Sequence, residues 1–246
     1  MTDHGRLRDV CNGTTVRVLT VMTEQQPDTA VFDIDGTLVD TNYHHTLAWY
    51  RAFRRFGIVL PVWRLHRAIG MGGDQLVAAV AGDRAESEHG DELRMAWAEE
   101  FDPMLEEIRP FAGVADLLAE VADRGLTVVL ASSGAPRHVE SYLDLFDGRS
   151  LAAAWTTSED VDHTKPEPDL LDVAVTKVGG GSAVVLGDSV WDFAAAQRAG
   201  YAGYAIRTGG FSPEELREAG AHEVFDSVEE LHEALDRTLL AGRALA

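Results

Sequence analysis

The sequence has little cysteine and no long hydrophobic run. Cys11 is the single cysteine among 246 residues, so no disulfide can form within the chain and a reducing compartment is indicated. No apolar stretch approaches the length of a membrane-spanning helix. The N-terminus also lacks the basic region, apolar core and cleavage site of a secretion signal. These absences predict a cytoplasmic protein with no membrane partner.

Positive charge is scarce as well. The chain has 21 basic residues against 41 acidic ones, which gives a formal net charge of -20. Because nonspecific nucleic-acid binding depends on basic side chains that neutralise phosphates, a nucleic-acid partner is not expected and a small ligand is favoured. Lysine is the scarcest cation, since only Lys165 and Lys177 accompany nineteen arginines.

Acidic residues are absent from residues 41–73, although the rest of the chain is rich in them. The basic residues in this window are Arg51, Arg54, Arg55, Arg64, Arg67, His44, His45 and His66. Two interpretations are equally open. The cluster could raise the local concentration of an anionic substrate, or it could be a solvated helix face whose arginines pair with acids elsewhere.

The hydrophobic pattern predicts a parallel α/β core. Strands are expected at residues 29–32, 126–131, 151–155, 183–186 and 201–206, and helices at residues 114–124, 136–146, 168–178 and 191–199. Between the first two strands lie roughly seventy residues of helical pattern, whereas a strand-helix-strand unit takes about 30. Helices are expected there at residues 43–56, from Pro61, at residues 74–81 and at residues 84–108.

This spacing predicts a helical module inserted after the first strand. The expected division is a loosely ordered tail at residues 1–27, a core formed by residues 28–41 and 109–246, and a helical cap at residues 42–108. Both connections of the cap would lie at the carboxyl end of the first strand, so the module is placed to act as a lid over that edge.

Asp33 and Asp35 follow the first apolar strand, just before Gly36. Ligands in open α/β sheets gather outside the carboxyl ends of the strands, and two adjacent carboxylates repel each other unless a cation or a shared proton compensates. Mg²⁺ prefers oxygen ligands and is often bound by one or two carboxylates together with a substrate phosphate. The pair therefore indicates a magnesium site, although an ordinary Asp-Gly turn would have the same sequence.

Three later segments add groups that a metal-bound phosphate site needs. Ser132 and Ser133 follow the strand at 126–131 and could bind a phosphate oxygen or simply cap the next helix. Lys165, in Lys165-Pro166-Glu167-Pro168, offers a compact ammonium in an arginine-rich chain, or is a surface lysine beside a turn. Asp188 is a candidate metal ligand after the strand at 183–186. Asp192, one helical turn later, could orient Lys165, or both acids could complement the helix dipole.

Taken together, Asp33-x-Asp35-Gly36-Thr37, Ser132, Lys165-Pro166 and Gly187-Asp188-x-x-x-Asp192 resemble the four ordered motifs of the haloacid dehalogenase superfamily. The resemblance covers about residues 29–236. It implies a Rossmann-like core with an inserted helical cap, similar to members of the phosphoglycolate phosphatase and β-phosphoglucomutase types. Dehalogenases of this superfamily have a non-acidic residue at the position of Asp35, so this residue points to phosphoryl transfer.

The resemblance also implies the roles of the candidate residues. Asp33 would attack phosphorus and form an aspartyl-phosphate, while Asp35 would protonate the leaving group and activate water. Mg²⁺ would be bound by Asp33, the main-chain carbonyl of Asp35 and Asp188, with help from Lys165. The remaining candidates bind substrate or support the site; they are Thr37, Ser132, Ser133, His45, Gly72, Gly73 and Asp192.

A phosphohexomutase of the β-phosphoglucomutase type is the alternative to a phosphatase. His45 and Trp49 match the spacing of that enzyme's first cap helix. Two departures count against it. The cap loop has Gly70-Met71-Gly72-Gly73-Asp74 where the mutase supplies a phosphate-binding arginine, and Gly187 replaces the acid before Asp188. The favoured prediction is a Mg²⁺-dependent phosphatase that hydrolyses a small phosphomonoester, either a sugar phosphate or a phosphoglycolate-like metabolite. Which phosphomonoester is the substrate and what the oligomeric state is are not indicated.

Overall fold

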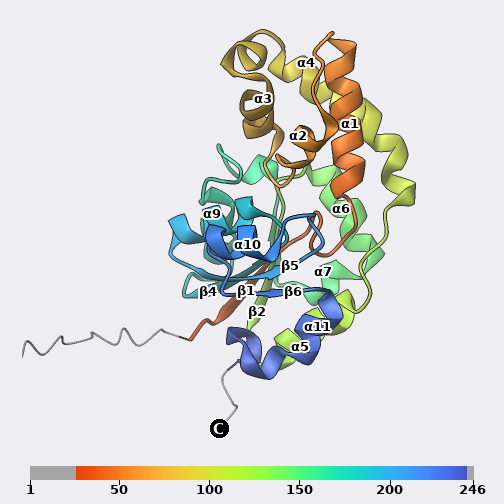
Figure 1. The fold of residues 1–246 in the computed structure, drawn as a ribbon. Helices are drawn as coiled ribbons and strands as arrows, with labels where there is room; N and C mark the ends of the chain where they lie inside the picture. Colours follow the sequence, from red (N-terminus) through yellow and green to blue (C-terminus); the bar gives the residue numbers. More distant parts are fainter. Residues whose placement is uncertain (1–25, 243–246) are drawn as a thin grey trace, which may run out of the picture.

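A computed structural model describes residues 26–242 (Figure 1). Cys11 and residues 1–25 of the expected N-terminal tail lie outside this part of the chain. Among the residues described, no helix is both long and apolar enough to span a membrane.

Six parallel strands form one sheet at the centre of the molecule. They are β1 (Thr29–Asp33), β2 (Thr127–Ala131), β3 (Ala154–Thr156), β4 (Ala183–Gly187), β5 (Ala202–Ile206) and β6 (Glu223–Phe225). Their order in the sheet is β3-β2-β1-β4-β5-β6. The strand order reverses at β1, which lies between β2 and β4, and open α/β sheets bind ligands at such a point.

Helices cover both faces of the sheet because both faces are apolar. Phe32 packs in a cluster with α5 (Val114–Asp123), α6 (Pro136–Leu145) and α11 (Val228–Glu233). Val31, its neighbour on the same strand, packs on the other side in a cluster with residues of two further helices. These are α8 (Asp169–Lys177) and α9 (Val190–Ala199). The alternation of side chains along a strand explains this division, and the near-continuous apolar sequence of β1 fits a strand buried on both faces.

Four helices inserted between β1 and α5 form a layer above one end of the sheet (Figure 1). They are α1 (Asn42–Arg55), α2 (Val62–His66), α3 (Gly73–Ala81) and α4 (Asp83–Phe101). These helices pack around an apolar cluster of their own, which includes Phe53, Leu76 and Leu93. The chain enters and leaves the insertion through adjacent segments, since Asp40 N donates a hydrogen bond to Arg109 O at 3.0 Å. The fold is thus α/β, with a Rossmann-like parallel sheet and an all-helical insertion.

Several elements differ from the sequence-based expectations. The helix expected at residues 84–108 ends at Phe101, and a 3-10 helix follows at Asp102–Glu107, because Pro103 has no N–H for an α-helical hydrogen bond. Within the strand expected at residues 151–155, only residues 154–155 pair, as part of β3, and Leu151 ends the short helix α7 (Gly148–Leu151). The edge strand β6 was not expected, since its three residues give too short a pattern. Neither α11 nor α10 (Pro213–Ala219) was predicted.

Candidate active site

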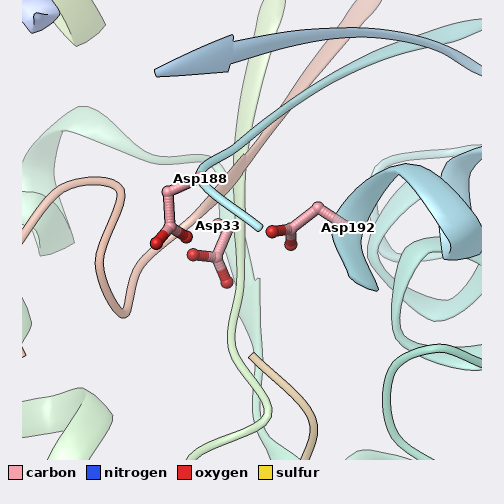
Figure 2. Close-up of side chains that lie close together, drawn as sticks. All are labelled: Asp33, Asp188 and Asp192. Carbon is pink, nitrogen blue, oxygen red and sulfur yellow. The ribbon is translucent and has the colours of Figure 1, made fainter. Parts of the chain in front are cut away.

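Three buried carboxylates meet where the strand order reverses (Figure 2). Asp33 is the last residue of β1, Asp188 follows β4, and Asp192 lies in the first turn of α9. Each offers an oxygen atom within 4.8 Å of the others, and the three residues are 5%, 2% and 1% exposed. Segments far apart in the sequence therefore form one acidic cluster at the carboxyl end of the sheet.

Lys165 lies inside this cluster. The residue is 1% exposed, and its ammonium forms ion pairs with Asp33 and, at 2.7 Å, with Asp192. Burial by itself would lower the pKa of Lys165, but the charges of Asp192 and Asp33 outweigh it and the pKa lies above its ordinary value. Lys165 is therefore a buried, charged residue of the cluster, and the alternative interpretation as a surface lysine beside a turn is wrong.

The cluster has more negative charge than its own residues neutralise. Three carboxylates face one ammonium. Burial, together with the neighbouring carboxylates, raises the pKa of Asp33 well above its ordinary value even though Lys165 opposes the shift. Burial and the charge of Asp192 raise the pKa of Asp188 to about 7. A divalent cation would remove this imbalance, and the all-oxygen donor set fits Mg²⁺.

The hydrogen bonds separate the roles of the acids. Both oxygens of Asp192 are engaged, one by Lys165 and the other by the N–H and hydroxyl of Ser189 at 3.0 and 2.6 Å. Asp192 thus caps α9 and orients Lys165. The Thr37 hydroxyl lies 2.8 Å from Asp33 Oδ2 and 3.1 Å from Asp188 Oδ1. Thr37 thus bridges Asp33 and Asp188, whereas Asp192 contacts Lys165 and the start of α9.

Asn42 is a site residue that the sequence analysis missed. Its side-chain amide donates a hydrogen bond of 2.8 Å to Asp188 Oδ2. The residue is 3% exposed and begins α1, so it orients Asp188 from the first turn of the insertion. Its position one residue after Thr41, in the segment that leaves the core, was the only signal in the sequence.

Gly36 lets the loop after β1 pass against Asp188. The φ of Gly36 is +86°, and a Cβ at this position would collide with Asn42 and with Asp188. Any other residue there would be strained by its backbone conformation and would displace a carboxylate of the cluster. The glycine that follows the two aspartates is thus required by the site geometry.

Asp35 lies beside the cluster, among hydrogen-bond donors. His45 Nε2 is 2.9 Å from Asp35 Oδ1, and the hydroxyls of Ser132 and Thr41 donate to Asp35 at 2.6 and 3.3 Å. Burial would raise the pKa of Asp35, but the hydrogen bonds from His45 and Ser132 and the charge of His45 together bring it below its ordinary value. The carboxylate of Asp35 is therefore favoured over its protonated form.

The two serines after β2 have different surroundings. Ser132 is fully buried; its hydroxyl donates to Asp35 and accepts a hydrogen bond from the N–H of Gly134 at 2.9 Å. It does not cap α6, whose N-cap residue is Ala135. The Ser133 hydroxyl is buried beside the cavity and has no hydrogen-bond partner among the described residues. Of the two, Ser133 is the hydroxyl left available to a ligand.

A cavity of about 490 Å³ opens above Asp33 and Asp35, between the sheet and the helical insertion. The predicted residues His45, Gly72 and Gly73 line it. The lining residues that were not predicted include Trp97, Arg94, Arg137 and His138. The helical spacing of the first two within α4 shows that they share a face, but only the tertiary structure turns that face toward the cavity.

A hydrogen-bonded contact joins the loop before α3 to the core. Thr164 Oγ1 accepts a hydrogen bond from Gly72 N at 3.0 Å and donates one to Asp74, while Thr164 N donates to Asp74 Oδ2 at 3.1 Å. Gly72 has no side chain to obstruct this approach, since a Cβ would collide with Thr164. Because Thr164 precedes Lys165, the contact links the insertion directly to the acidic cluster.

The arginines of residues 41–73 lie outside the cavity. Arg55 pairs with Glu99 at 2.7 Å, Arg67 pairs with Glu215 at 2.6 Å, and Arg51 lies 3.8 Å from Glu100. None of the five arginines in this window lines the cavity. These three arginines are thus paired with acids, as the helix-face interpretation expects.

Comparison with known proteins agrees with this geometry. Residues 27–200 match the model of the haloacid dehalogenase-like hydrolase family. Validoxylamine A 7'-phosphate phosphatase from Streptomyces hygroscopicus subsp. limoneus is 26% identical, over 70% of this chain and 81% of its own. Protein CbbY from Cereibacter sphaeroides is 29% identical, over 82% of this chain and 92% of its own.

A solved structure also matches closely. The crystal structure of a hydrolase from Pseudomonas syringae superimposes with a TM-score of 0.80 at 30% identity, covering 85% of this chain and 98% of that one. The family match covers most of the chain, including β1, the insertion, β2 and β4. The chain therefore belongs to the haloacid dehalogenase-like hydrolase family.

Proposed function

We propose that this protein is a Mg²⁺-dependent phosphatase that hydrolyses a small phosphomonoester through an aspartyl-phosphate on Asp33. The observation that supports this most directly is the buried pairing of Asp33 with Lys165, beside Asp188 and below a cavity of about 490 Å³. The name of the validoxylamine A 7'-phosphate phosphatase, a relative, points to the same reaction class.

Asp33 is placed to act as the nucleophile. Lys165 contacts Asp33 Oδ1 and the Thr37 hydroxyl contacts Oδ2, so the carboxylate is fixed in orientation at the cavity floor. Attack by one oxygen on phosphorus would break the bond to the alcohol and leave the phosphoryl group on Asp33. Hydrolysis of that acyl phosphate by water would then release inorganic phosphate and regenerate the carboxylate, so one difficult displacement becomes two easier ones.

Asp35 would transfer the protons. In the first step it gives a proton to the departing alkoxide, and in the second it accepts one from water. Its lowered pKa suits the second step. His45 Nε2, which is 2.9 Å from Asp35, is the adjacent group that can supply the proton for the first step.

The metal ion would be bound by Asp33 and Asp188, together with the main-chain carbonyl of Asp35. The excess negative charge of the cluster and its oxygen-only donors fit Mg²⁺, which when bound would neutralise charge on the transferring phosphoryl group. Asn42 and Thr37 would hold Asp188 in place. Lys165, oriented by Asp192, and the free hydroxyl of Ser133 would bind phosphoryl oxygens.

The helical insertion would act as a cap that excludes water from the cavity. The contact of Gly72 and Asp74 with Thr164 would hold this cap closed. Gly73, which lines the cavity, would lie next to the substrate and help to set specificity. Water exclusion protects the aspartyl-phosphate from premature reaction and strengthens electrostatic interactions in the site.

Phosphate release and metal dependence test this function. Purified protein, treated with a chelator and dialysed, should release phosphate from a panel of phosphomonoesters only after Mg²⁺ is restored; Ca²⁺, which prefers more ligands and longer bonds, should restore much less activity. Equal turnover with and without a divalent ion would contradict the proposal.

The phosphohexomutase alternative requires residues that bind a second phosphate group of the substrate. Arg94 and Arg137 line the cavity, but each is paired with acids. Hydrolysis is therefore the better supported outcome. Incubation with a hexose 1-phosphate separates the two, because a phosphatase releases inorganic phosphate whereas a mutase yields the 6-phosphate.

A further inference from the structure

The cavity wall opposite Asp33 is mostly apolar. Trp49, Trp97 and Met71 line it, together with Met95, which is 66% exposed. Trp49 and Trp97 stack with ring centroids 5.6 Å apart. Stacked indoles and methionine side chains in one cavity lining form a surface that is stabilised when it covers an apolar face of a ligand.

Both arginines in this wall are already neutralised. Arg94 lies 2.9 Å from Glu86 and 2.8 Å from Asp91. It also donates a hydrogen bond of 3.1 Å to Gly73 O. Its guanidinium donors are thus largely committed to groups of the insertion itself, and an anionic ligand would have to compete with two carboxylates for them.

Arg137 is in the same situation. It lies 2.6 Å from Asp102, whose other oxygen is 2.9 Å from His138 Nε2. Asp74 and Asp162 add negative charge to the lining. The two arginines of the wall are therefore outnumbered by five carboxylates, three that pair with them and two that line the cavity, so the wall is electrostatically unfavourable to an anion.

We propose that the site selects phosphomonoesters whose alcohol part has no negative charge and presents an apolar face. This inference rests on the proposed phosphatase function and narrows its substrate class. A second phosphate or a carboxylate would meet the carboxylates of this wall, in which both arginines among the described residues are already paired, and like charges in contact disfavour the wrong partner. Bisphosphates and phosphorylated carboxylic acids are the excluded classes.

Matched esters test the selectivity. Benzyl phosphate and 4-carboxybenzyl phosphate have alcohols of similar reactivity and differ by one carboxylate. We expect kcat/KM to be about tenfold or more higher for benzyl phosphate. Benzyl phosphate should also exceed 2-hydroxyethyl phosphate, which lacks an apolar face. Equal or better hydrolysis of the carboxylated ester would overturn the inference.

A variant on α4 provides the second test. Glu86→Gln removes the half-buried partner of Arg94, so it should shift the ratio of kcat/KM toward the carboxylated ester by about fivefold. Glu88→Gln is the matched control, because it makes the same charge change on the same helix but affects an exposed pair with Arg84. An unchanged ratio in Glu86→Gln, or an equal shift in both variants, would contradict the role of Arg94 neutralisation.

Binding measurements keep this inference separate from the proposed function. Calorimetry with Asp33→Asn protein and Mg²⁺ measures affinity for the two esters without turnover. Tighter binding of benzyl phosphate supports the selectivity even if the wild-type protein hydrolyses nothing, which would contradict only the phosphatase. Equal binding of the two esters, or tighter binding of the carboxylated one, overturns the selectivity.

Discussion

At the residue scale, the environment of Asp35 is the feature that most directly sets the proposed chemistry. Burial of the carboxylate would raise its pKa, yet hydrogen bonds from His45 and Ser132 hold the pKa below the ordinary value. His45 itself stacks on Phe101 with ring centroids 4.2 Å apart. The imidazole is thus fixed by packing on one side and by Asp35 on the other, which limits the loss of side-chain freedom during catalysis.

Replacement of His45 tests this arrangement. We expect His45→Gln to lower kcat about tenfold with a smaller change in KM, because the variant misplaces a proton-transfer group while the phosphate contacts stay intact. Steady-state phosphate release measures both constants. His44→Gln, one residue earlier on α1, is the control and should stay within about twofold of wild type; equal losses in the two variants would indicate a structural effect.

The carboxylates of the acidic cluster could be identified from the sequence because each lies close to the carboxyl end of an apolar strand. Asp33 ends β1 and Asp188 follows β4, and these buried strands are neighbours in the parallel sheet, so the proximity of the two acids follows from topology. Asn42 and Arg94 could not be chosen in this way. Their functions depend on how the insertion packs on the core, which the helical periodicity of α1 and α4 does not determine.

At the element scale, the contact between the loop before α3 and Thr164 joins the insertion to the core. Its hydrogen bonds involve one core residue, Thr164, and two residues at the start of α3: Gly72, which precedes the helix, and Asp74 in its first turn. A second contact lies at the other side of the insertion, where Arg67 O accepts a hydrogen bond of 3.1 Å from Trp191. Two separated contacts resist rotation of the insertion about its connecting segments.

Loss of the Thr164 hydroxyl should therefore loosen the cap. We expect Thr164→Val to raise KM about fivefold, since it removes the hydrogen bonds to Gly72 and Asp74 that hold the cap over the substrate. Thr176→Val, on the exposed side of α8, makes the same change away from the site. A normal KM in Thr164→Val protein with unchanged thermal stability would argue against a cap held closed by this contact.

Most elements were predictable, and the errors have physical causes. Long apolar strands and amphipathic helices repeat their pattern often enough to be recognised, as in β1 and α1. Pro103 ended α4 earlier than its apolar spacing suggested. The short strand β6 depends on pairing with β5 rather than on its own sequence.

At the scale of the whole molecule, net charge opposes an anionic substrate. The formal charge is -20, and Arg51, Arg55 and Arg67 pair with acids and do not line the cavity. Long-range repulsion should slow the approach of a phosphomonoester at low ionic strength, because surface charges interact over the Debye length.

Salt should therefore not lower the catalytic efficiency. We expect kcat/KM for the phosphate monoester of an uncharged alcohol, measured with saturating Mg²⁺, to stay constant or rise as the salt concentration increases from about 0.05 M to about 0.5 M. A steering patch at residues 41–73 would produce the opposite trend. A several-fold fall in kcat/KM that is abolished in Arg54→Gln protein would restore the steering interpretation.

The most direct test of the central claim is phosphate release by Asp33→Asn protein. The variant keeps the size of the side chain but loses the nucleophile, so turnover should fall on the order of a thousandfold or more, while circular dichroism and thermal unfolding show an intact fold. Asp172→Asn, on the outer side of α8, should keep wild-type activity. Turnover by Asp33→Asn within about tenfold of wild type would contradict the aspartyl-phosphate mechanism.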